Sequence, residues 1–447
     1  MSDYASKHFR RNFFLGVTNG FIFMAGSSFL NPTTILPKFL ENVFESKALI
    51  GVGSYLLMLG WCLPQLPAAY FARSMTHRKP LYVVSNAVRM ALIGAFALSL
   101  YLFHDSRTTV GVLFFVLLGM SGVAAGLVGL AYQDIVSRTI PPTRRGAYNA
   151  YRIFGGQGLT ALAGSFLVKY VLDHPEKFPY PYNYVLFFGT AWLLMSIGVT
   201  AFSMIKEPPD PAVRPRGSVR AFVLELYLIL KTNANYRRFL LQKLLRACEV
   251  FAIPYYILFA TDVLGLGDSV VGTFQIVGVA TMLVAAILWG KVSDKSGNRR
   301  VIYRSSITAA LTPIVALALF ALHSAGVFKA ETLDLSRVSS GLAIGTRPLL
   351  IAVMSLIFVL IATASAGAQI GFQNYIMESA PLRRRPIYLG MTTTIDGILL
   401  VALPAVGGFL IDWKGYGPCF LAAAATVAAS AFLALRLCEP RHAVRCT

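Results

Sequence analysis

The sequence predicts an all-α integral membrane protein with twelve transmembrane helices in two six-helix bundles. Three observations support this fold class: an apolar composition, twelve long apolar runs and an internal repeat. Of the 447 residues, 56% are hydrophobic and 13% are charged, whereas about a quarter of the residues of a soluble protein are charged. The chain therefore belongs in a lipid bilayer.

Each predicted span is an apolar run of about 20 residues or more, the length that a helix needs to cross a bilayer. The runs lie at 12–36, 48–73, 80–103, 109–134, 146–171, 184–205, 237–262, 269–292, 300–323, 348–377, 386–411 and 416–437. Between the sixth and seventh runs, Val219–Leu230 is apolar but too short to cross, so we expect an interfacial helix there. The predicted division is a first bundle at 1–205, a cytoplasmic linker with this helix at 206–236, and a second bundle at 237–447.

Basic residues predict the orientation of the spans. Most of the 40 Lys and Arg residues lie on the side that holds both termini, and cytoplasmic loops carry such an excess. We therefore predict a multi-pass protein of the cell (inner) membrane with both termini in the cytoplasm. The basic residues that give the chain a net charge of +20 lie between apolar runs. This placement indicates that their partner is the anionic leaflet of the lipid bilayer, and it argues against binding of nucleic acid.

The two halves repeat each other at three places. Pro32-x-x-Ile35-Leu36 recurs as Pro254-x-x-Ile257-Leu258, and Arg78-Lys79-Pro-Leu-Tyr82 corresponds to Arg299-Arg300-Val-Ile-Tyr303. Gln133, Pro141, Arg144, Arg145 and Tyr148 correspond to Gln373, Pro381, Arg384, Arg385 and Tyr388. Three pairings in the same order indicate a duplicated unit.

A charged stretch separates the eighth and ninth runs and reads Gly290-Lys-Val-Ser-Asp294-Lys295-Ser-Gly297-Asn-Arg299-Arg300. Its charges need water, so we expect a cytoplasmic loop in which Gly297 forms the turn. The stretch resembles the G-x-x-x-D-[RK]-x-G-[RK]-[RK] loop of the major facilitator superfamily of secondary transporters, from which Asn298 departs. With the twelve runs and the repeat, the resemblance covers essentially the whole chain.

This resemblance implies two bundles around a central cavity that opens alternately to each side, lined mainly by the first, fourth, seventh and tenth helices. It also implies a conformational latch made by the charged loop, with Asp294 facing the N-terminal end of a neighbouring helix near Gly146. The latch residues are Gly290, Asp294, Gly297, Arg299 and Arg300. In the first half Arg73 replaces the acid of the loop, so such a latch is expected on one side only.

Acids within the spans are candidates for proton coupling, because ionisable groups in a bilayer are costly. Glu249 is the first candidate: the three-and-four spacing of Gln242, Arg246, Glu249, Ile253 and Tyr256 puts these side chains on one stripe of the seventh helix. Burial favours the protonated acid and Arg246 favours the carboxylate, a competition that suits a proton-coupled carrier. The alternative is a permanent Arg246–Glu249 ion pair that makes burial tolerable.

Two further acids complete the coupling candidates. Asp396 follows Thr392, Thr393 and Thr394 in the eleventh span, where either proton coupling or bonding to these hydroxyls would explain it. Asp134 lies beside the arginine-rich segment 138–145, which favours a gating or structural partner over a coupling site.

Polar side chains within the spans are candidates for the substrate cavity. They are Asn19, Asn31, Gln133, Arg152, Arg246, Tyr255, Tyr256, Gln275, Gln369 and Gln373. Neutral amides in spans also bond across helices, so each has this structural alternative. Gln133 and Gln373 stand out because the repeat makes them equivalent.

The chain lacks the G-x-x-x-x-G-K-[ST] and H-E-x-x-H motifs, so we expect no enzyme activity, cofactor or bound metal. We predict a monomeric secondary transporter that moves a small organic solute by alternating access, coupled to protons. Family habit favours export. The alternatives are a proton-coupled or facilitated importer of a metabolite, for which an anion is one option, and a non-transporting membrane sensor or scaffold.

The orientation can be tested by labelling. In a cysteine-free background, a cysteine at Ser218 should react only from the cytoplasm, and one between Glu331 and Arg337 only from outside. Reaction of the Ser218 cysteine with an impermeant reagent from outside would contradict the twelve-helix topology.

Overall fold

The computed structural model describes residues 7–62, 64, 75–141, 144, 147–148, 151–209, 227–329, 332–334, 343–381 and 385–439. Within them, ten segments are helices long and apolar enough to cross a membrane. The other two predicted spans, 48–73 and 146–171, lie partly outside the described residues and are seen as shorter helices. The prediction of an all-α membrane fold is confirmed.

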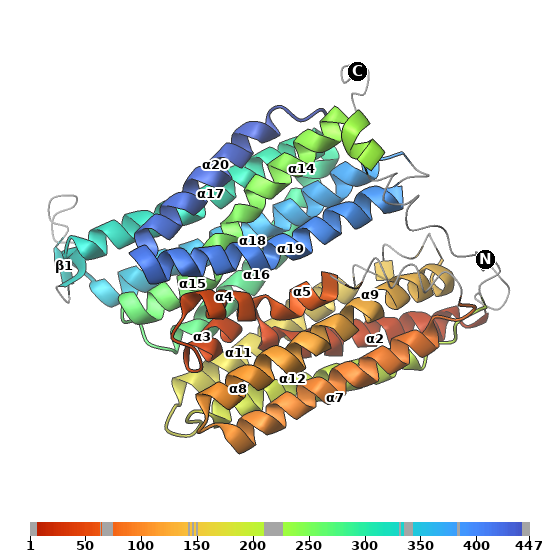
Figure 1. Cartoon of the computed structure of the whole chain (residues 1–447), viewed down its shortest axis with the longest axis horizontal. Coiled ribbons are helices and arrows are strands. Elements are labelled where there is room, and N and C mark those ends of the chain that lie inside the picture. The colour runs from red at the N-terminus through yellow and green to blue at the C-terminus, as the bar shows by residue number, and fades with distance from the viewer. Residues whose placement is uncertain are drawn as a thin grey trace. The chain divides into compact units, whose positions relative to one another are not determined.

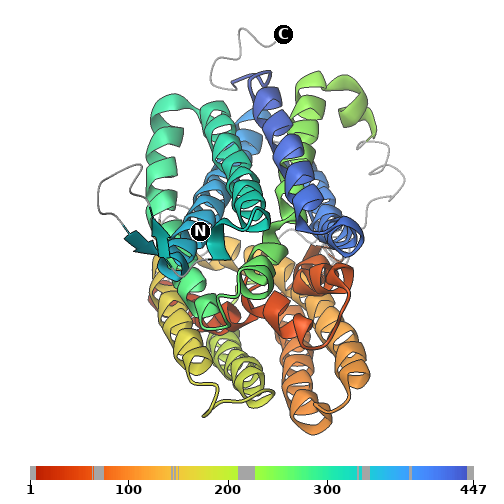
Figure 2. The ribbon, with the colours of Figure 1, turned by 90° about the vertical axis from the view of Figure 1, so that its left-hand side faces the viewer.

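The chain forms two compact units, which we describe separately. Unit 1 comprises Met1–Phe44, Gly53–Thr232 and Pro386–Val401, and unit 2 comprises Glu45–Val52, Asn233–Arg385 and Ala402–Thr447. Seen along the helices in Figure 2, each unit is a bundle.

Unit 1 contains the helices of the first half (Figure 1). They are α2 (Phe9–Ser27), η1 (Ser28–Leu30), α3 (Ile35–Glu41), α5 (Leu56–Cys62), α7 (Lys79–Phe103), α8 (Arg107–Leu113), η2 (Phe114–Leu118), α9 (Gly119–Thr139), η3 (Arg152–Thr160), α11 (Ala161–Asp173) and α12 (Tyr182–Ser203). A buried cluster that includes Tyr82, Ile135 and Phe202 joins α7, α9 and α12. Helices α5 and α9 meet at glycines: a Cβ on Gly60 would lie 2.4 Å from the carbonyl carbon of Gly122, so larger residues would separate them.

Unit 2 contains the helices of the second half. They are α14 (Ala234–Ala247), η4 (Cys248–Phe251), α15 (Ile253–Leu258), η5 (Phe259–Val263), α16 (Val270–Ser296), α17 (Asn298–Ser324), η6 (Val327–Lys329), α18 (Thr346–Ser379) and α20 (Tyr416–Ala434). Helices α4 (Lys47–Ser54) and α19 (Arg385–Lys414) each contribute residues to both units. Helix α17 packs on α18 and α20, and α16 packs on α18.

Two proline-linked breaks repeat between the halves. The first span is interrupted at Asn31, whose extended backbone precedes Pro32, and the seventh changes from α-helix to the 3-10 segment η4 shortly before Pro254. Proline has no N–H for the helix ladder and restricts the residue before it. The pairing of Pro32 with Pro254 in the sequence therefore corresponds to a repeated backbone feature.

Within the charged stretch 290–300, the loop between the two helices is much shorter than we expected. Helix α16 continues to Ser296 and α17 begins at Asn298, so Gly297, with a φ of 82°, forms the connection alone. The helices extend past the apolar runs, which places the charges at helix ends. Another unexpected feature is a two-stranded antiparallel sheet before α18, formed by β1 (Thr332–Asp334) and β2 (Ala343–Gly345).

Candidate functional site

The stripe predicted on the seventh span is present and buried in unit 2. Arg246 lies in the last turn of α14, and Glu249 follows about one turn later in η4. The Arg246 guanidinium donates through Nη1 to Oε2 of Glu249, and the two side chains are 5% and 4% exposed. The three-residue spacing places them on neighbouring turns, so the pair forms within one span.

The stripe faces other helices of unit 2. Gln242 donates through Nε2 to Oγ of Ser306 on α17 at 3.2 Å and to the carbonyl of Ser430 on α20 at 3.4 Å. The Tyr256 ring stacks on Phe420 of α20, with the ring centroids 5.3 Å apart. The polar residues of the seventh span therefore lie in a packed interior.

Several polar atoms of this stripe lack hydrogen-bond partners. Within the described part of the chain, Oε1 of Glu249, Nε of Arg246 and the hydroxyl of Tyr256 are buried and make no hydrogen bond. An unpartnered buried carboxylate oxygen is costly: protonation would remove its charge, and a ligand donor would supply the missing hydrogen bond. The geometry can thus accommodate either a proton or a ligand group at Glu249.

Unit 1 holds a second buried charge at Arg152, in η3. Its Nη1 atom donates to the carbonyl of Gly16 at 2.6 Å and to Oδ1 of Asn19 at 2.8 Å, both on α2. Asn19 in turn donates through Nδ2 to the carbonyl of Gly198 on α12 at 2.9 Å. Asn19 therefore orients Arg152, which is the cross-helix role that we gave as the alternative for amides.

Arg152 is surrounded by neutral groups. Its guanidinium lies over the rings of Tyr132 and Tyr148, with centroid distances of 4.8 and 5.5 Å. Among the residues that the structure describes, the hydrogen-bond partners of Arg152 are a carbonyl, an amide and a hydroxyl group, and none of them is a carboxylate. A guanidinium presents donors in a planar fork that matches carboxylate or phosphate. Such a ligand would supply the missing negative charge.

The other cavity candidates are dispersed. Asn31 accepts from the backbone and hydroxyl of Thr33, and Tyr255 donates to the carbonyls of Lys47 and Pro404, so both have structural partners. Gln275 is buried in α16. The amides of Gln133, Gln369 and Gln373 are exposed, and Asp396 is half-buried on α19.

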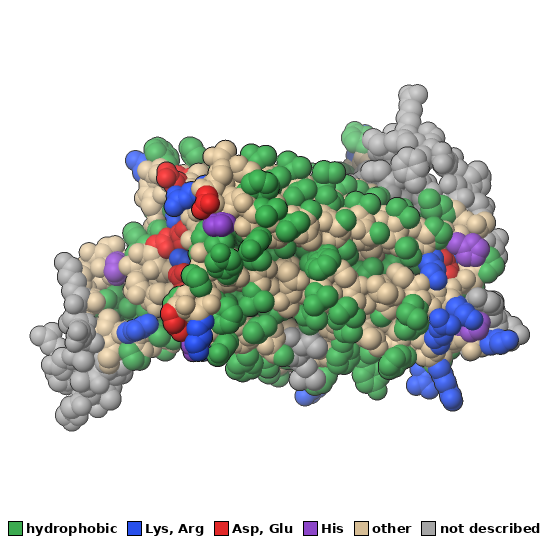
Figure 3. All heavy atoms as spheres, turned by 90° about the horizontal axis from the view of Figure 1, so that it is seen from below, with side chains coloured by type: hydrophobic (Ala, Val, Ile, Leu, Met, Phe, Trp, Pro, Cys, Tyr) green, Lys and Arg blue, Asp and Glu red, His purple; other side chains and the backbone are tan. Residues whose placement is uncertain are grey.

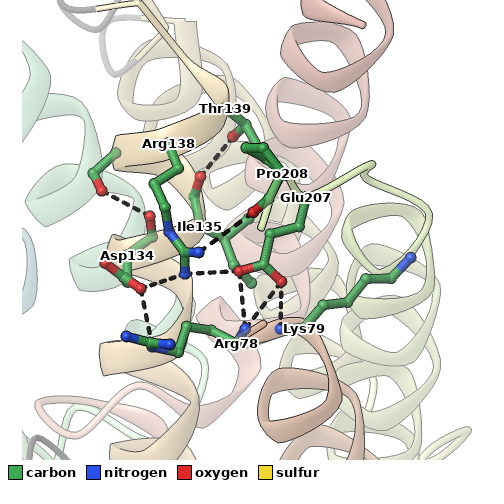
Figure 4. A network of polar contacts seen from close by, with 9 residues as sticks. Arg78, Lys79, Asp134, Ile135, Arg138, Thr139, Glu207 and Pro208 are labelled. Atoms are coloured by element: carbon green, nitrogen blue, oxygen red, sulfur yellow. Dashed lines mark hydrogen bonds and ion pairs between the residues drawn. The ribbon is translucent and has the colours of Figure 1, made fainter. Parts of the chain in front are cut away.

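Asp134 belongs to a charge network at one end of unit 1 (Figure 4). It pairs with Nε of Arg78 at 3.1 Å and with Arg138, and Arg138 also pairs with Glu207 at 2.7 Å. The side chain of Asp134 is 35% exposed and that of Glu207 is 1% exposed. This arrangement supports the partner role for Asp134.

Glu207 is a residue that the sequence reasoning missed. Its carboxylate accepts from the backbone N–H groups of Arg78 and Lys79, at 2.8 to 3.0 Å, and so caps the start of α7. Glu439 does the same for α17, accepting from the N–H of Arg299 at 3.0 Å. The signal was present: a Glu-Pro pair follows both the sixth and the twelfth span, at Glu207-Pro208 and Glu439-Pro440.

The predicted latch residues lie at the junction of α16 and α17. Gly297 forms the turn, Asp294 and Arg300 are exposed, and Gly290 lies within α16. Asn298, the departure from the family pattern, is fully buried and accepts from Oγ of Ser293 at 2.7 Å. The proposed partner region of Asp294 near Gly146, and Arg73 of the first half, lie outside the described residues.

Comparisons with known proteins agree with this fold. The sequence profile of the Major Facilitator Superfamily matches residues 16–333, and no curated protein matches the chain by sequence. A D-xylose-proton symporter has a similar structure (TM-score 0.69, 14% identity, covering 96% of this chain and 98% of that chain). A mutant of the nucleoside transporter NupG is also similar (TM-score 0.68, 14% identity, covering 95% and 99%), as is a bacterial homologue of the iron transporter ferroportin (TM-score 0.60, 14% identity, covering 96% and 98%). At these identities the likeness shows the fold alone.

The network of Figure 4 generates a stability prediction. Glu207→Gln should lower the stability of the purified protein by about 1 to 3 kcal/mol, because it removes the buried carboxylate that pairs with Arg138 and accepts from the N–H groups of Arg78 and Lys79. Asp134→Asn, at the more exposed acid, should cost less than about 1 kcal/mol. Thermal unfolding in detergent measures both, and equal losses would contradict the assignment of Glu207 as the central acid.

Proposed function

Because the chain belongs to the major facilitator superfamily, we propose that it is a proton-coupled secondary transporter of a small organic anion, working by alternating access. The observation that carries the coupling is the buried Arg246–Glu249 pair with its unpartnered Oε1 atom. A buried pair that merely stabilises the bundle is expected to have its remaining atoms satisfied. In this pair, Oε1 of Glu249 and Nε of Arg246 have no hydrogen-bond partner.

The charge of the solute follows from the basic residues. Arg152 is buried and surrounded by neutral partners within the described residues, and a bound anion would balance it. Arg246 becomes unbalanced when Glu249 takes up a proton. Both features support a carboxylate or phosphate group on the solute.

The direction of coupling follows from linkage. If protonation of Glu249 leaves Arg246 without a counter-charge, it favours anion binding, and anion binding favours protonation to the same extent. Two ligands that bind together are carried together, so we propose symport with the proton. Export, which we predicted from family habit, requires a solute that competes with the proton. Acidification or alkalinisation around inside-out vesicles on addition of the solute distinguishes the two.

The coupling role of Glu249 has a direct test in proteoliposomes. Glu249→Gln imitates the protonated acid, so it should keep exchange of bound solute while abolishing accumulation driven by a pH gradient. Arg246→Ala should instead impair folding, with a loss of about 3 to 5 kcal/mol, because it leaves a buried carboxylate unpaired.

Asp396→Asn is the matched control for Glu249→Gln, since it neutralises the other candidate acid. It should retain gradient-driven accumulation. If Asp396→Asn loses accumulation and Glu249→Gln keeps it, the coupling site lies in α19 and the Arg246–Glu249 pair is structural.

The charge of the solute can be tested before the solute is known. A thermal-stabilisation screen of the protein in detergent should yield organic acids or phosphate esters, and Arg152→Gln should weaken their binding about 10- to 100-fold, the value of a hydrogen bond to a charged group. Arg152→Lys should lose less, because it keeps the charge. Arg89→Gln, at a half-buried arginine of α7 whose guanidinium lies over the ring of Phe23, is the matched control, and stabilisation by neutral compounds alone would contradict an anionic solute.

A further inference from the structure

A basic pocket lies beside the network of Figure 4, where α7 begins and α12 ends. Its volume is about 480 Å³. Its wall combines the basic side chains of His77, Lys79 and Lys206 with the apolar side chains of Pro80, Val83 and Ile205. This end of unit 1 is the one that the sequence predicts to be cytoplasmic.

Glu207 also borders the pocket, but its charge is already engaged. Its carboxylate accepts from the N–H groups of Arg78 and Lys79 and pairs with Arg138. The side chain of Lys79 points away from this network in Figure 4. Over the described ranges, no carboxylate forms an ion pair with the ammonium group of Lys79 or Lys206. The pocket therefore presents net positive charge.

The start of α2 extends this positive region. Asn12 holds the backbone of Lys206 from both sides, donating to its carbonyl and accepting from its N–H at 3.0 Å. The pKa of His8 is lowered, first by desolvation and then by the charges of Lys206, Lys7 and Arg11. His8, Lys7 and Arg11 therefore lie close to Lys206, which lines the pocket.

Exposed apolar side chains adjoin the basic residues. On α7, Val83 is 37% and Val84 62% exposed, and Val88 follows one turn later at 47%. Met204, at the end of α12, is 52% exposed. Figure 3 shows one face with a broad apolar band and Lys, Arg and His side chains gathered at the end where α2 begins. A molecule held here would contact charge at one end and hydrocarbon-facing side chains at the other.

We propose that this pocket binds the headgroup phosphate of an anionic phospholipid, held between Lys79 and Lys206 with an acyl chain along the exposed valines of α7. Lysine binds phosphate as a point charge, and its stem packs on apolar surface while the ammonium stays at the interface. A soluble phosphate compound shares the headgroup chemistry but would leave the apolar wall uncovered. The combination of charge and exposed valines therefore selects the lipid.

The test compares lipids that differ only in their headgroup. Native mass spectrometry of the full chain in detergent should show retention of dioleoyl phosphatidylglycerol over dioleoyl phosphatidylcholine. Each lysine near an anionic headgroup contributes to binding, so Lys79→Gln and Lys206→Gln should each reduce the retained phosphatidylglycerol about fivefold. The double variant Lys79→Arg with Lys206→Arg should retain it, which shows that loss of charge and not misfolding is measured.

Two controls make the proposal falsifiable. Lys291→Gln and Lys295→Gln each remove one positive charge from an exposed position of α16, as the test variants do, and each should leave retention unchanged. An equal loss there would show diffuse attraction in place of a site. Glycerol phosphate, a headgroup without chains, should not displace the lipid at millimolar concentration, and displacement would overturn the assignment to a lipid.

Discussion

Hydrocarbon offers no hydrogen-bond partner to a charge or to a free backbone group, and the placement of the polar residues in this protein follows from that constraint. Arg152 is tolerated because a carbonyl of α2, an amide and two aromatic rings surround it. Arg246 and Glu249 are tolerated because each neutralises the other. What remains unsatisfied at these two positions is therefore informative, since the fold has provided partners for most of the atoms around them.

The same constraint acts at the ends of the helices, where the first backbone N–H groups have no partner within the helix. In both halves the chain returns after the last helix of the repeat and supplies a glutamate to the third, Glu207 to α7 and Glu439 to α17. An asparagine at the start of the first helix of each half holds that returning segment, Asn12 in unit 1 and Asn235 in unit 2. The duplication thus preserves a polar arrangement as well as the apolar spans.

Sequence reasoning found the features that depend on local chemistry. Composition and run length predicted the spans, proline marked the two breaks, and the spacing of Arg246 and Glu249 predicted their contact. Each of these features depends on a few neighbouring residues. Contacts between segments that are distant in the sequence could not be predicted from it. Nothing near Asn19 indicates that it orients Arg152, and Glu207 was passed over because it lies outside every span.

The charged stretch at 290–300 shows a further limit. Its charges predict contact with water, but polarity does not distinguish a loop from a helix end that extends past the bilayer. Only the backbone of Gly297 decides between them, because its positive φ connects two helices without additional residues. The buried amide of Asn298 then explains the departure from the family pattern, since a long basic side chain there would have to leave the space that the asparagine fills.

Whether the Arg246–Glu249 pair couples a proton or only stabilises the bundle depends on access as well as charge. Glu249 lies in the 3-10 segment η4, where the backbone departs from the α-helix, and one helical turn before it Arg246 lies near the end of α14. Helix α20 packs beside this region through the stacking of Phe420 on Tyr256. Under the proposed coupling, a proton would reach the buried Oε1 of Glu249 when η4 and α20 separate and admit water. Because 3-10 segments within helices often mark hinges, separation of η4 from α20 would expose the acid in one conformation and bury it in another. A permanent structural pair needs no such separation, so the two roles differ in whether η4 moves relative to α20.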